Sequence, residues 1–596
     1  MRKQVSVLGR QLQIGRIFSV RRQISCVAIL GILCALFVGS PAEGAASELR
    51  DDSSPWGVAT GAEWFSAFPI FNPLLKQAGV RWLRGFFEWQ TIQPKQGYWN
   101  FALQDHLVKN ARANNLHLVG TFAYLAPWAS ADGGTRKFPI KDIQFWRDYV
   151  TGMVKRYHSD IKYWEVWNEF NGGFAENGTP EIYAELVREA SIAAKKIDPT
   201  VKIGMSVANF DVNFLDAAIK AGAANHFDYI CIHPYEKLSA LAHGGEPAFL
   251  AMAGTLRQML ASNQQPPNIP LWITEIGSQA PSTPNAAGDQ LQATLLAKAY
   301  LLSIASGFER IFWFEARGPA HGNPADFGLL RADMTPRPSY EALKAMTEML
   351  GPSPVTVGRL DLGDDSYAFV FEAQGKYVLS AWTTKKDGID VTFAANVRVS
   401  DLKLNQQSLP EGKALHLTDE PRLILDVPAA LVQEARSNKV KTPPSEIAYP
   451  HANEASAQLK TINIENGMTQ ISPETTIPES GARRTDISRR DGEGHYIYFL
   501  VDPQVVPFGV RDIRVTAIVR RLSQDRAAGL SVNYESQRGY VNTPYSDIPA
   551  DDAWHEISWK ITDASFVGAW GWNFRLNAIS SPNDFLVKEV RLKINP

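Results

Sequence analysis

The fold of this chain is decided by a short, mostly apolar run that ends in two polar residues: Tyr163-Trp164-Glu165-Val166-Trp167-Asn168-Glu169. We predict that the run is a β-strand, because it is short and rich in aromatic residues and contains the β-branched Val166. Asn168 and Glu169 follow it directly. In barrel enzymes the chemistry lies at the carboxyl ends of the strands, so this pair is a candidate for catalysis.

Similar apolar runs recur on both sides of this one, from Trp56 to about Leu350. Eight candidate strands lie at residues 57–59, 82–86, 117–123, 163–166, 202–206, 229–232, 271–274 and 310–314. Helical patterns separate them, for example at 143–157, 181–197 and 291–306. Eight strands that alternate with helices predict a (β/α)8 barrel. A doubly wound sheet is the alternative, but it usually has a Gly-rich phosphate turn after its first strand, and the sequence has none there.

A second candidate strand also ends in a carboxylate: Pro270-Leu271-Trp272-Ile273-Thr274-Glu275. Glu169 and Glu275 would then face one another across the mouth of the barrel. Cleavage of a glycosidic bond needs such a pair, one to protonate the departing oxygen and one to attack or to activate water. A separation of about 5–5.5 Å predicts retention of configuration, and about 6.5–9.5 Å predicts inversion.

Further motifs appear in strand order: Gly79-Val80-Arg81-Trp82-Leu83-Arg84 with Gly97-Tyr98-Trp99, then His233-Pro234-Tyr235, Trp313, Phe327-Gly328-Leu329-Leu330 and Pro336-Arg337-Pro338. Together with Asn168-Glu169 and Thr274-Glu275, they resemble clan A glycoside hydrolases, and most closely glycoside hydrolase family 39. The resemblance covers about residues 55–350. One departure is Phe170, where many clan A enzymes have proline.

The resemblance implies that Glu169 is the general acid/base and Glu275 the nucleophile. Glu169 lies between Trp167 and Phe170 in the sequence, so we expect burial to raise its pKa. Glu275 must remain ionised, which requires donors or positive charge nearby.

The resemblance also implies a set of substrate-binding residues. Arg84 and Tyr235 would hold Glu275, and Asn168 would bind the sugar 2-hydroxyl. His233 would bind a sugar hydroxyl or orient a neighbour, Trp313 would form the floor under the reacting sugar, and Trp128 would line a subsite. Structural roles are the alternatives: an ion pair for Arg84 and core packing for His233 and Trp313.

The composition is that of an ordinary globular protein, with 45% hydrophobic and 20% charged residues among 596. A net charge of −2 gives no electrostatic reason to expect nucleic acid as a partner. The cysteines are Cys26, Cys34 and Cys231, and no metal-ligand spacing is present. We therefore expect no metal and no cofactor.

The N-terminal segment 1–46 reads as an export signal rather than as part of the fold. A basic stretch that ends at Arg21-Arg22 precedes an uncharged, largely apolar run and then Gly44-Ala45-Ala46. This order predicts a cleaved signal peptide, and an uncleaved membrane anchor is the alternative. Either reading predicts an exported protein that is secreted, periplasmic or associated with the cell envelope.

The sequence predicts five regions: the leader at 1–46, the barrel at 50–351, a small β domain at 352–433, a linker at 434–459 and a β-sandwich at 460–596. The last region resembles jelly-roll carbohydrate-binding modules. The predicted function is retaining hydrolysis of an extracellular or envelope polysaccharide or oligosaccharide. A catalytically silent carbohydrate-binding or scaffold protein and a transglycosylase remain the alternatives, and the sequence leaves the oligomeric state open.

Overall fold

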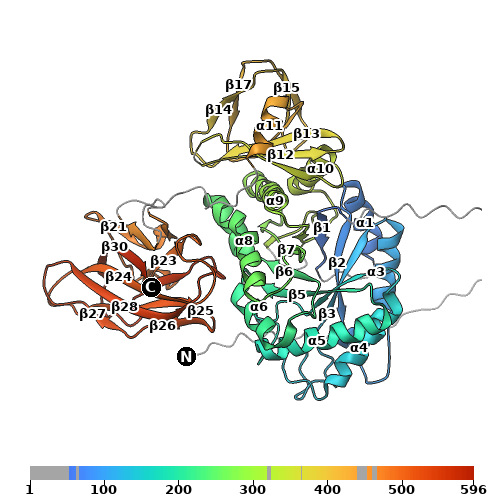
Figure 1. Cartoon of the computed structure of the whole chain (residues 1–596), viewed down its shortest axis with the longest axis horizontal. Helices are drawn as coiled ribbons and strands as arrows, with labels where there is room; N and C mark the ends of the chain where they lie inside the picture. Colours follow the sequence, from blue (N-terminus) through green and yellow to red (C-terminus); the bar gives the residue numbers. More distant parts are fainter. Residues whose placement is uncertain are drawn as a thin grey trace, which may run out of the picture. The chain divides into compact units, whose positions relative to one another are not determined.

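A computed structural model describes residues 53–61, 66–318, 324–363, 365–438, 453–459 and 466–595 (Figure 1). The predicted leader and most of the predicted linker lie outside these residues. None of the helices in the described part is long and apolar enough to cross a bilayer.

The first eight long strands close into a parallel barrel, in the order in which they occur in the chain. The prediction of a (β/α)8 barrel is thus confirmed. Every predicted strand is present, and each end differs by no more than two residues. The barrel strands are β1 (Trp56–Ala59), β2 (Trp82–Glu88), β3 (His117–Ala123), β4 (Tyr163–Val166), β5 (Lys202–Ala208), β6 (Tyr229–His233), β7 (Leu271–Ile276) and β9 (Arg310–Phe314).

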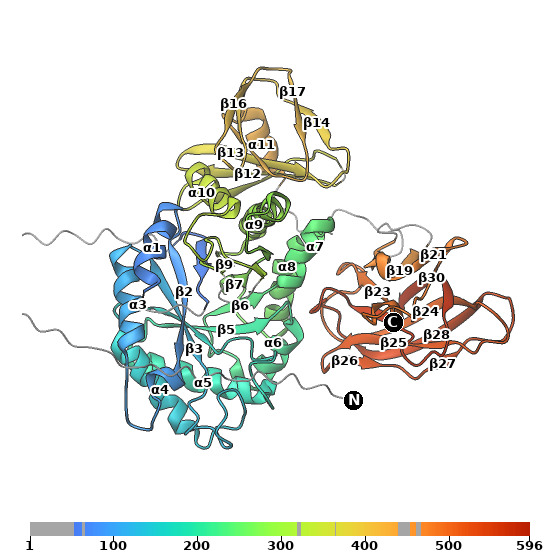
Figure 2. The same ribbon diagram turned by 180° about the vertical axis from the view of Figure 1, so that it is seen from behind.

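Helices lie around the outside of these strands (Figures 1 and 2). Their apolar faces form one continuous core with the outward-pointing strand residues. Two short helices, α2 (Trp89–Ile92) and α7 (Tyr235–Ala240), directly follow β2 and β6. The main helices are α1 (Phe68–Gln77), α3 (Ala102–Ala113), α4 (Ile143–Tyr157), α5 (Pro180–Ile197), α6 (Val212–Ala218), α8 (Glu246–Ser262), α9 (Ala286–Ser306) and α10 (Pro338–Leu350).

The inside of the barrel has an aromatic layer below its mouth. Trp82, Tyr229, Trp272 and Phe312 pack there as a separate buried cluster. The guanidinium of Arg310 lies 4.3 Å from the ring centres of both Trp82 and Trp272. Since strand side chains alternate in direction, the next inward positions along each strand lie one layer higher, at the mouth. The aromatic layer therefore supports the polar layer in which the candidate site lies.

Residues after α10 form a six-stranded antiparallel sheet, with a two-stranded sheet and helix α11 (Ala429–Ser437). The prediction of a β-rich second region is confirmed. Short strands with few apolar residues, β11, β15 and β16, were not predicted. The strands are β11 (Val355–Arg359), β12 (Ser366–Ala373), β13 (Lys376–Thr383), β14 (Ile389–Thr392), β15 (Val397–Ser400), β16 (Gln406–Leu409), β17 (Ala414–Leu417) and β18 (Arg422–Leu425).

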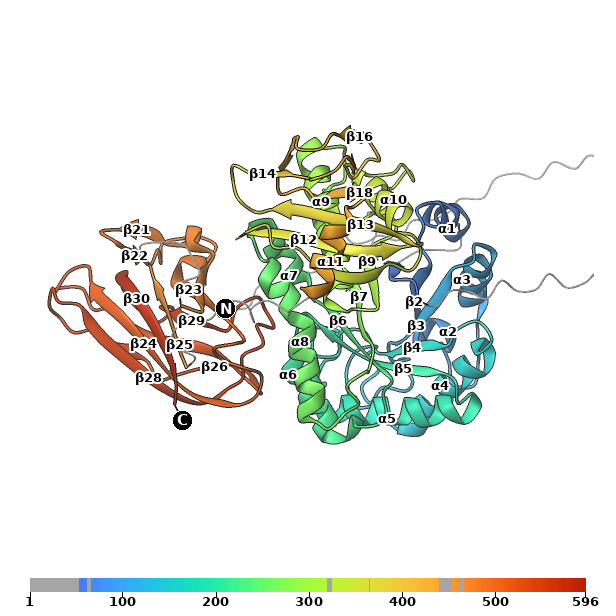
Figure 3. The same ribbon diagram turned by 45° about the horizontal axis from the view of Figure 1, so that its top comes forward.

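The C-terminal region is antiparallel and has a hydrophobic core of its own (Figure 3). Its strands are β19 (Glu454–Gln458), β20 (Met468–Ile471), β21 (Ile477–Glu479), β22 (Ala482–Arg484), β23 (Tyr496–Val501), β24 (Arg511–Arg521), β25 (Gly529–Ser536), β26 (Gly539–Asn542), β27 (Ser546–Asp547), β28 (His555–Ala564), β29 (Phe574–Asn577) and β30 (Phe585–Ile594). Two short hairpin strands, β26 and β27, and all four strands before β23 were not predicted.

The predicted linker needs a correction at both ends. Helix α11 continues through Ser437, and β19 pairs with β30. Proline, serine and charged residues dominate the stretch, and this composition concealed both elements. In α11 the buried residues are Val432 and Ala435 alone. In β19 only two alanines are buried.

Candidate active site

The backbone turns sharply after β4, and this turn brings Asn168 and Glu169 into the mouth of the barrel. Trp167 and Glu169 have left-handed conformations, with φ of 67° and 52°. Such conformations are strained for residues other than glycine and cluster at functional sites. The indole of Trp167 is fully buried and donates to the carbonyl of Phe174 at 3.0 Å, which holds the turn in place.

Glu275 reaches the mouth because β7 contains an extra residue. Ile273 pairs with Ile311 and Ile276 pairs with Trp313, so three steps on β7 face two steps on β9. Such a bulge re-aims the side chains near it. Strict alternation would have placed Glu275 on the same outward face as Ile273. Instead its carboxylate accepts from Tyr235 and Arg84.

The carboxylate of Glu275 receives one donor on each oxygen. The Tyr235 hydroxyl donates to Oε1 at 2.8 Å, and Arg84 Nη1 donates to Oε2 at 2.9 Å. Both contacts favour the ionised form of Glu275, which is the form that a nucleophile requires. Burial and the charge of Glu275 raise the pKa of Tyr235 well above its ordinary value, so Tyr235 remains a donor.

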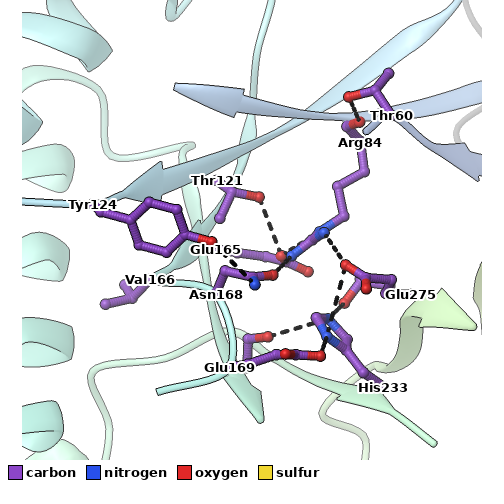
Figure 4. Close-up of polar contacts among 12 residues, drawn as sticks. Thr60, Arg84, Thr121, Tyr124, Glu165, Val166, Asn168, Glu169, His233 and Glu275 are labelled. Carbon is purple, nitrogen blue, oxygen red and sulfur yellow. Dashed lines mark hydrogen bonds and ion pairs between the residues drawn. The ribbon is translucent and has the colours of Figure 1, made fainter. Parts of the chain in front are cut away.

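Glu169 lies opposite and is paired with His233 (Figure 4). The distance from His233 Nδ1 to Glu169 Oε1 is 2.9 Å, and His233 Nε2 lies 3.2 Å from the Thr274 hydroxyl. One oxygen each of Glu169 and Glu275 lies within 4.8 Å of the other. Both side chains remain partly accessible, with 16% and 10% of their surface exposed.

Arg84 is the hub of the site. Its guanidinium is fully buried and donates to three acceptors: Glu165 at 2.7 Å, Asn168 Oδ1 at 2.8 Å and Glu275 at 2.9 Å. The amide of Asn168 is therefore oriented, and its Nδ2 lies 3.4 Å from the Tyr124 hydroxyl. Burial lowers the pKa of Arg84, but the charges of Glu165 and Glu275 outweigh burial and raise it.

The expected direction of the pKa shift at Glu169 was wrong. Burial does raise the pKa of Glu169, as predicted from its apolar neighbours. The hydrogen bond and charge of His233, with the charge of Arg84, outweigh burial and leave that pKa below its ordinary value. The sequence could not show this effect, because His233 lies 64 residues away.

One predicted substrate residue, Trp313, lies away from the two glutamates, and the subsite role of Trp128 stays a prediction. Trp313 is fully buried in the core between strands and helices, and its indole donates to the carbonyl of Phe327 at 3.2 Å. It cannot form the floor under a sugar, because it points outward on β9, whereas its neighbour Phe314 points inward. Trp128 donates to the carbonyl of Gln93 and packs edge-on against Trp89, and no described contact joins it to the two glutamates.

One buried residue of the site was overlooked. Glu165 points inward on β4, two positions after Tyr163, in the layer that also holds Arg84 and Thr274. Counting two residues along each strand from its inward-pointing aromatic residue would have identified Arg84, Glu165 and Thr274. The quoted run itself contained the signal, since a carboxylate in the middle of a buried strand is costly and needs a partner.

Glu169, His233 and Glu275 are also the only group among the described residues with the spacing to hold a metal ion. Their present contacts favour a different role. Glu275 is engaged by two donors, and the guanidinium beside it would repel a cation. We therefore interpret the three side chains as a carboxylate pair with an associated histidine.

Comparison with known proteins agrees with this geometry. Residues 123–358 match the family model of "Glycosyl hydrolases family 39". The match covers the part of the chain that forms most of the barrel. That matched region contains Asn168, Glu169, His233 and Glu275, but Arg84 lies before it.

Relatives of this chain include a β-xylosidase of Caldicellulosiruptor saccharolyticus, which is 26% identical over 240 residues, 36% of this chain and 48% of that protein. This chain thus spans about half the length of that relative. An endo-1,4-β-xylanase of Hypocrea jecorina is 24% identical over 274 residues, 43% of this chain and 72% of the relative. A solved family 39 glycoside hydrolase of Bacteroides cellulosilyticus shares the fold, with a TM-score of 0.53 and 21% identity over 62% of this chain and 80% of the other.

Proposed function

We propose that this protein is a retaining glycoside hydrolase in which Glu275 is the nucleophile and Glu169 the acid/base. One observation carries the proposal. The two carboxylates follow β4 and β7 and approach within 4.8 Å across the barrel mouth. This approach is closer to the separation of about 5–5.5 Å in retaining glycosidases than to the roughly 6.5–9.5 Å of inverting ones, and it supports the retaining assignment.

In the first step the ionised Glu275 attacks the anomeric carbon, and Glu169 donates its proton to the departing oxygen. The carbon–oxygen bond to the leaving group breaks as the ester bond to Glu275 forms. Arg84 and Tyr235 hold Glu275 by one oxygen each, which orients its carboxylate. Asn168, itself held by Arg84, is placed to bind the sugar 2-hydroxyl.

In the second step Glu169 removes a proton from water, which attacks the anomeric carbon and releases Glu275. His233 contacts Glu169 at 2.9 Å and stabilises the carboxylate form that this step requires. The intermediate is also open to attack by a sugar hydroxyl in place of water. Transglycosylation is thus the same chemistry with a different acceptor.

The relatives give the first substrates to test. A β-xylosidase and an endo-1,4-β-xylanase are similar to part of this chain, so xylose-based oligosaccharides and polysaccharides come first in our proposal. We further propose that the protein is exported and acts on a polysaccharide outside the cytoplasm. This proposal rests on the basic and apolar segment before Gly44.

Glycan binding by the C-terminal region remains a proposal. Its candidate stacking residues divide into two groups. Tyr534 and Trp559 are buried, whereas Trp570 and Tyr545 are 54% and 40% exposed. Two exposed aromatic side chains provide faces for sugars, and we propose them as the first positions to substitute in a binding assay.

The experiment compares wild type with Glu169→Gln and Glu275→Gln on xylo-oligosaccharides and a broader glycan panel. Each variant should lose about 10³-fold or more in kcat with natural substrates. Proton NMR of the first product should show the anomer of the substrate. Glu246→Gln, in a buried ion pair on α8, is the matched control and should remain active.

A wild type that binds glycans but releases no product, like both variants, would establish the scaffold alternative. An inverted first product would refute the assignment of Glu275 as the nucleophile. Addition of a chelator should leave the activity unchanged, and a loss restored by a divalent cation would point to the metal reading of the site.

A further inference from the structure

We propose that Glu165 is a positioning residue: a buried counter-ion that fixes the Arg84 guanidinium between Glu275 and Asn168 and takes up part of its charge. This inference rests on the proposed function. Glu165 is fully buried and bonds to Arg84, so it acts through Arg84 and not on substrate. Figure 4 shows it on the far side of the guanidinium from Glu275.

The contacts of Arg84 divide its donors among three partners. Nε donates to Glu165 at 2.7 Å, Nη2 to Asn168 at 2.8 Å and Nη1 to Glu275 at 2.9 Å. A guanidinium and a carboxylate ordinarily pair through two parallel bonds. With Nε held by Glu165 and Nη2 by Asn168, only a single bond reaches Glu275. Its other oxygen is left to Tyr235.

The charge balance gives the second part of the argument. Arg84 and Glu165 are both fully buried, and Glu275 is nearly so. Arg84 therefore divides its positive charge between two carboxylates. A buried carboxylate is costly unless it is paired. Glu165 has no contact with solvent, so its ion pair with Arg84 has to offset the cost of burying its charge. Without Glu165, the positive charge of Arg84 would interact with Glu275 alone and more strongly. Glu275 would then be a weaker nucleophile.

The ionised state of Glu165 follows from the same contacts. Burial raises the pKa of Glu165, but the charges of Arg84 and His233, with hydrogen bonds from Thr274 and Arg84, outweigh burial and lower it. Other titratable groups that interact with the cluster lie after β3 and β4 and on α5, β6 and α7: Tyr124, Glu169, Tyr183, Tyr229, Cys231, His233 and Tyr235.

Loss of the negative charge at Glu165 should act on both catalytic glutamates in the same direction. In Glu165→Gln the positive charge of Arg84 is no longer shared, so it should interact more strongly with the carboxylates of both Glu275 and Glu169. The acidic and basic limbs of kcat/KM should then both move to lower pH, by about one unit. A role in packing alone would lower kcat or stability and leave both limbs in place.

The test measures pH profiles of kcat/KM for wild type, Glu165→Gln, Glu165→Asp and Glu246→Gln. Glu165→Asp keeps the charge but breaks the 2.7 Å contact, so its limbs should stay while kcat falls about tenfold. Glu246 is equally buried and pairs with Lys298 at 2.9 Å away from the site, so its variant should lose stability and keep the wild-type limbs.

The proposal would be overturned if both limbs of the pH profile of kcat/KM in Glu165→Gln stayed at their wild-type positions. If that variant does not fold, an unchanged kcat in Glu165→Asp overturns it equally. A wild type without hydrolytic activity would be a failure of the proposed function. The inference would then be decided by NMR titration of ¹³C-labelled glutamates, assigned with Glu169→Gln and Glu275→Gln, in which midpoints unchanged by Glu165→Gln refute it.

Discussion

At the residue scale, the pKa of Glu169 decides how well this residue serves as the acid in the first step and as the base in the second. An acid with a pKa below its ordinary value donates readily but holds its proton only at low pH. His233 is the largest opponent of burial here. The same contact favours the carboxylate, which serves as the base in the second step. His233 thus favours the second half of the cycle over the first.

His233→Leu tests this balance. With the histidine removed, burial should dominate and raise the pKa of Glu169, so the basic limb of kcat/KM should move to higher pH by about one unit. We also expect kcat to fall about tenfold or more as the base in the second step weakens. Ser206→Ala removes only the 3.4 Å contact to Nε2 and serves as the control. A basic limb that moves to lower pH would contradict this assignment.

At the element scale, a single buried side chain supports the connection between two strands. It accepts hydrogen bonds from backbone N–H groups that have no partner in a strand or helix. In the C-terminal region, Glu535 of β25 accepts from the backbone N–H groups of Val567, Gly568 and Ala569, between β28 and β29. The side chain of Asn573 donates to it as well, at 3.1 Å. A turn of three successive N–H groups around one carboxylate forms only if that carboxylate is present.

Glu535→Ala should therefore lower the free energy of unfolding by about 3 kcal/mol or more, because it leaves several buried N–H groups without acceptors. Urea unfolding followed by tryptophan fluorescence measures the loss. Glu556→Ala, on the exposed face of β28, should change stability by less than about 0.5 kcal/mol. Equal effects of the two substitutions would show that the carboxylate does not support the connection.

At the scale of the whole molecule, the second sheet shares a hydrophobic core with the barrel. Phe369, Phe371 and Trp382 belong to the same buried cluster as the residues of the barrel helices. The indole of Trp382 donates to Glu246 of α8 at 3.1 Å. The C-terminal region has a core of its own, but Val567 and Ala569 belong to the barrel cluster and Lys237 of α7 donates to the carbonyl of Gly568 at 2.7 Å.

Trp382→Ala should destabilise the barrel as well as the sheet that carries it, by about 3–5 kcal/mol. The midpoint of thermal inactivation of the proposed glycosidase activity reports the barrel alone and should fall. Trp570→Ala, at an exposed position of the C-terminal region, is the matched control and should leave that midpoint unchanged. If the Trp382→Ala variant kept the wild-type midpoint of thermal inactivation, the barrel and the second sheet would unfold separately.

The sequence by itself determined the barrel and the positions of the two glutamates along it. Strand formation depends on local apolar patterning, and the polar residues that end β4 and β7 are visible as breaks in that pattern. The same pattern predicted too few strands in the two C-terminal regions, since short strands with two buried residues carry almost no periodic signal.

Only the tertiary structure decided how the side chains of the site are used. A bulge in β7 turned Glu275 inward, alternation on β9 turned Trp313 outward, and Glu165 met Arg84 across 81 residues of sequence. The direction of the pKa shift at Glu169 depended on His233 in the same way. Charges interact through distances in space, and those distances are fixed by the closure of the barrel and not by spacing along the chain.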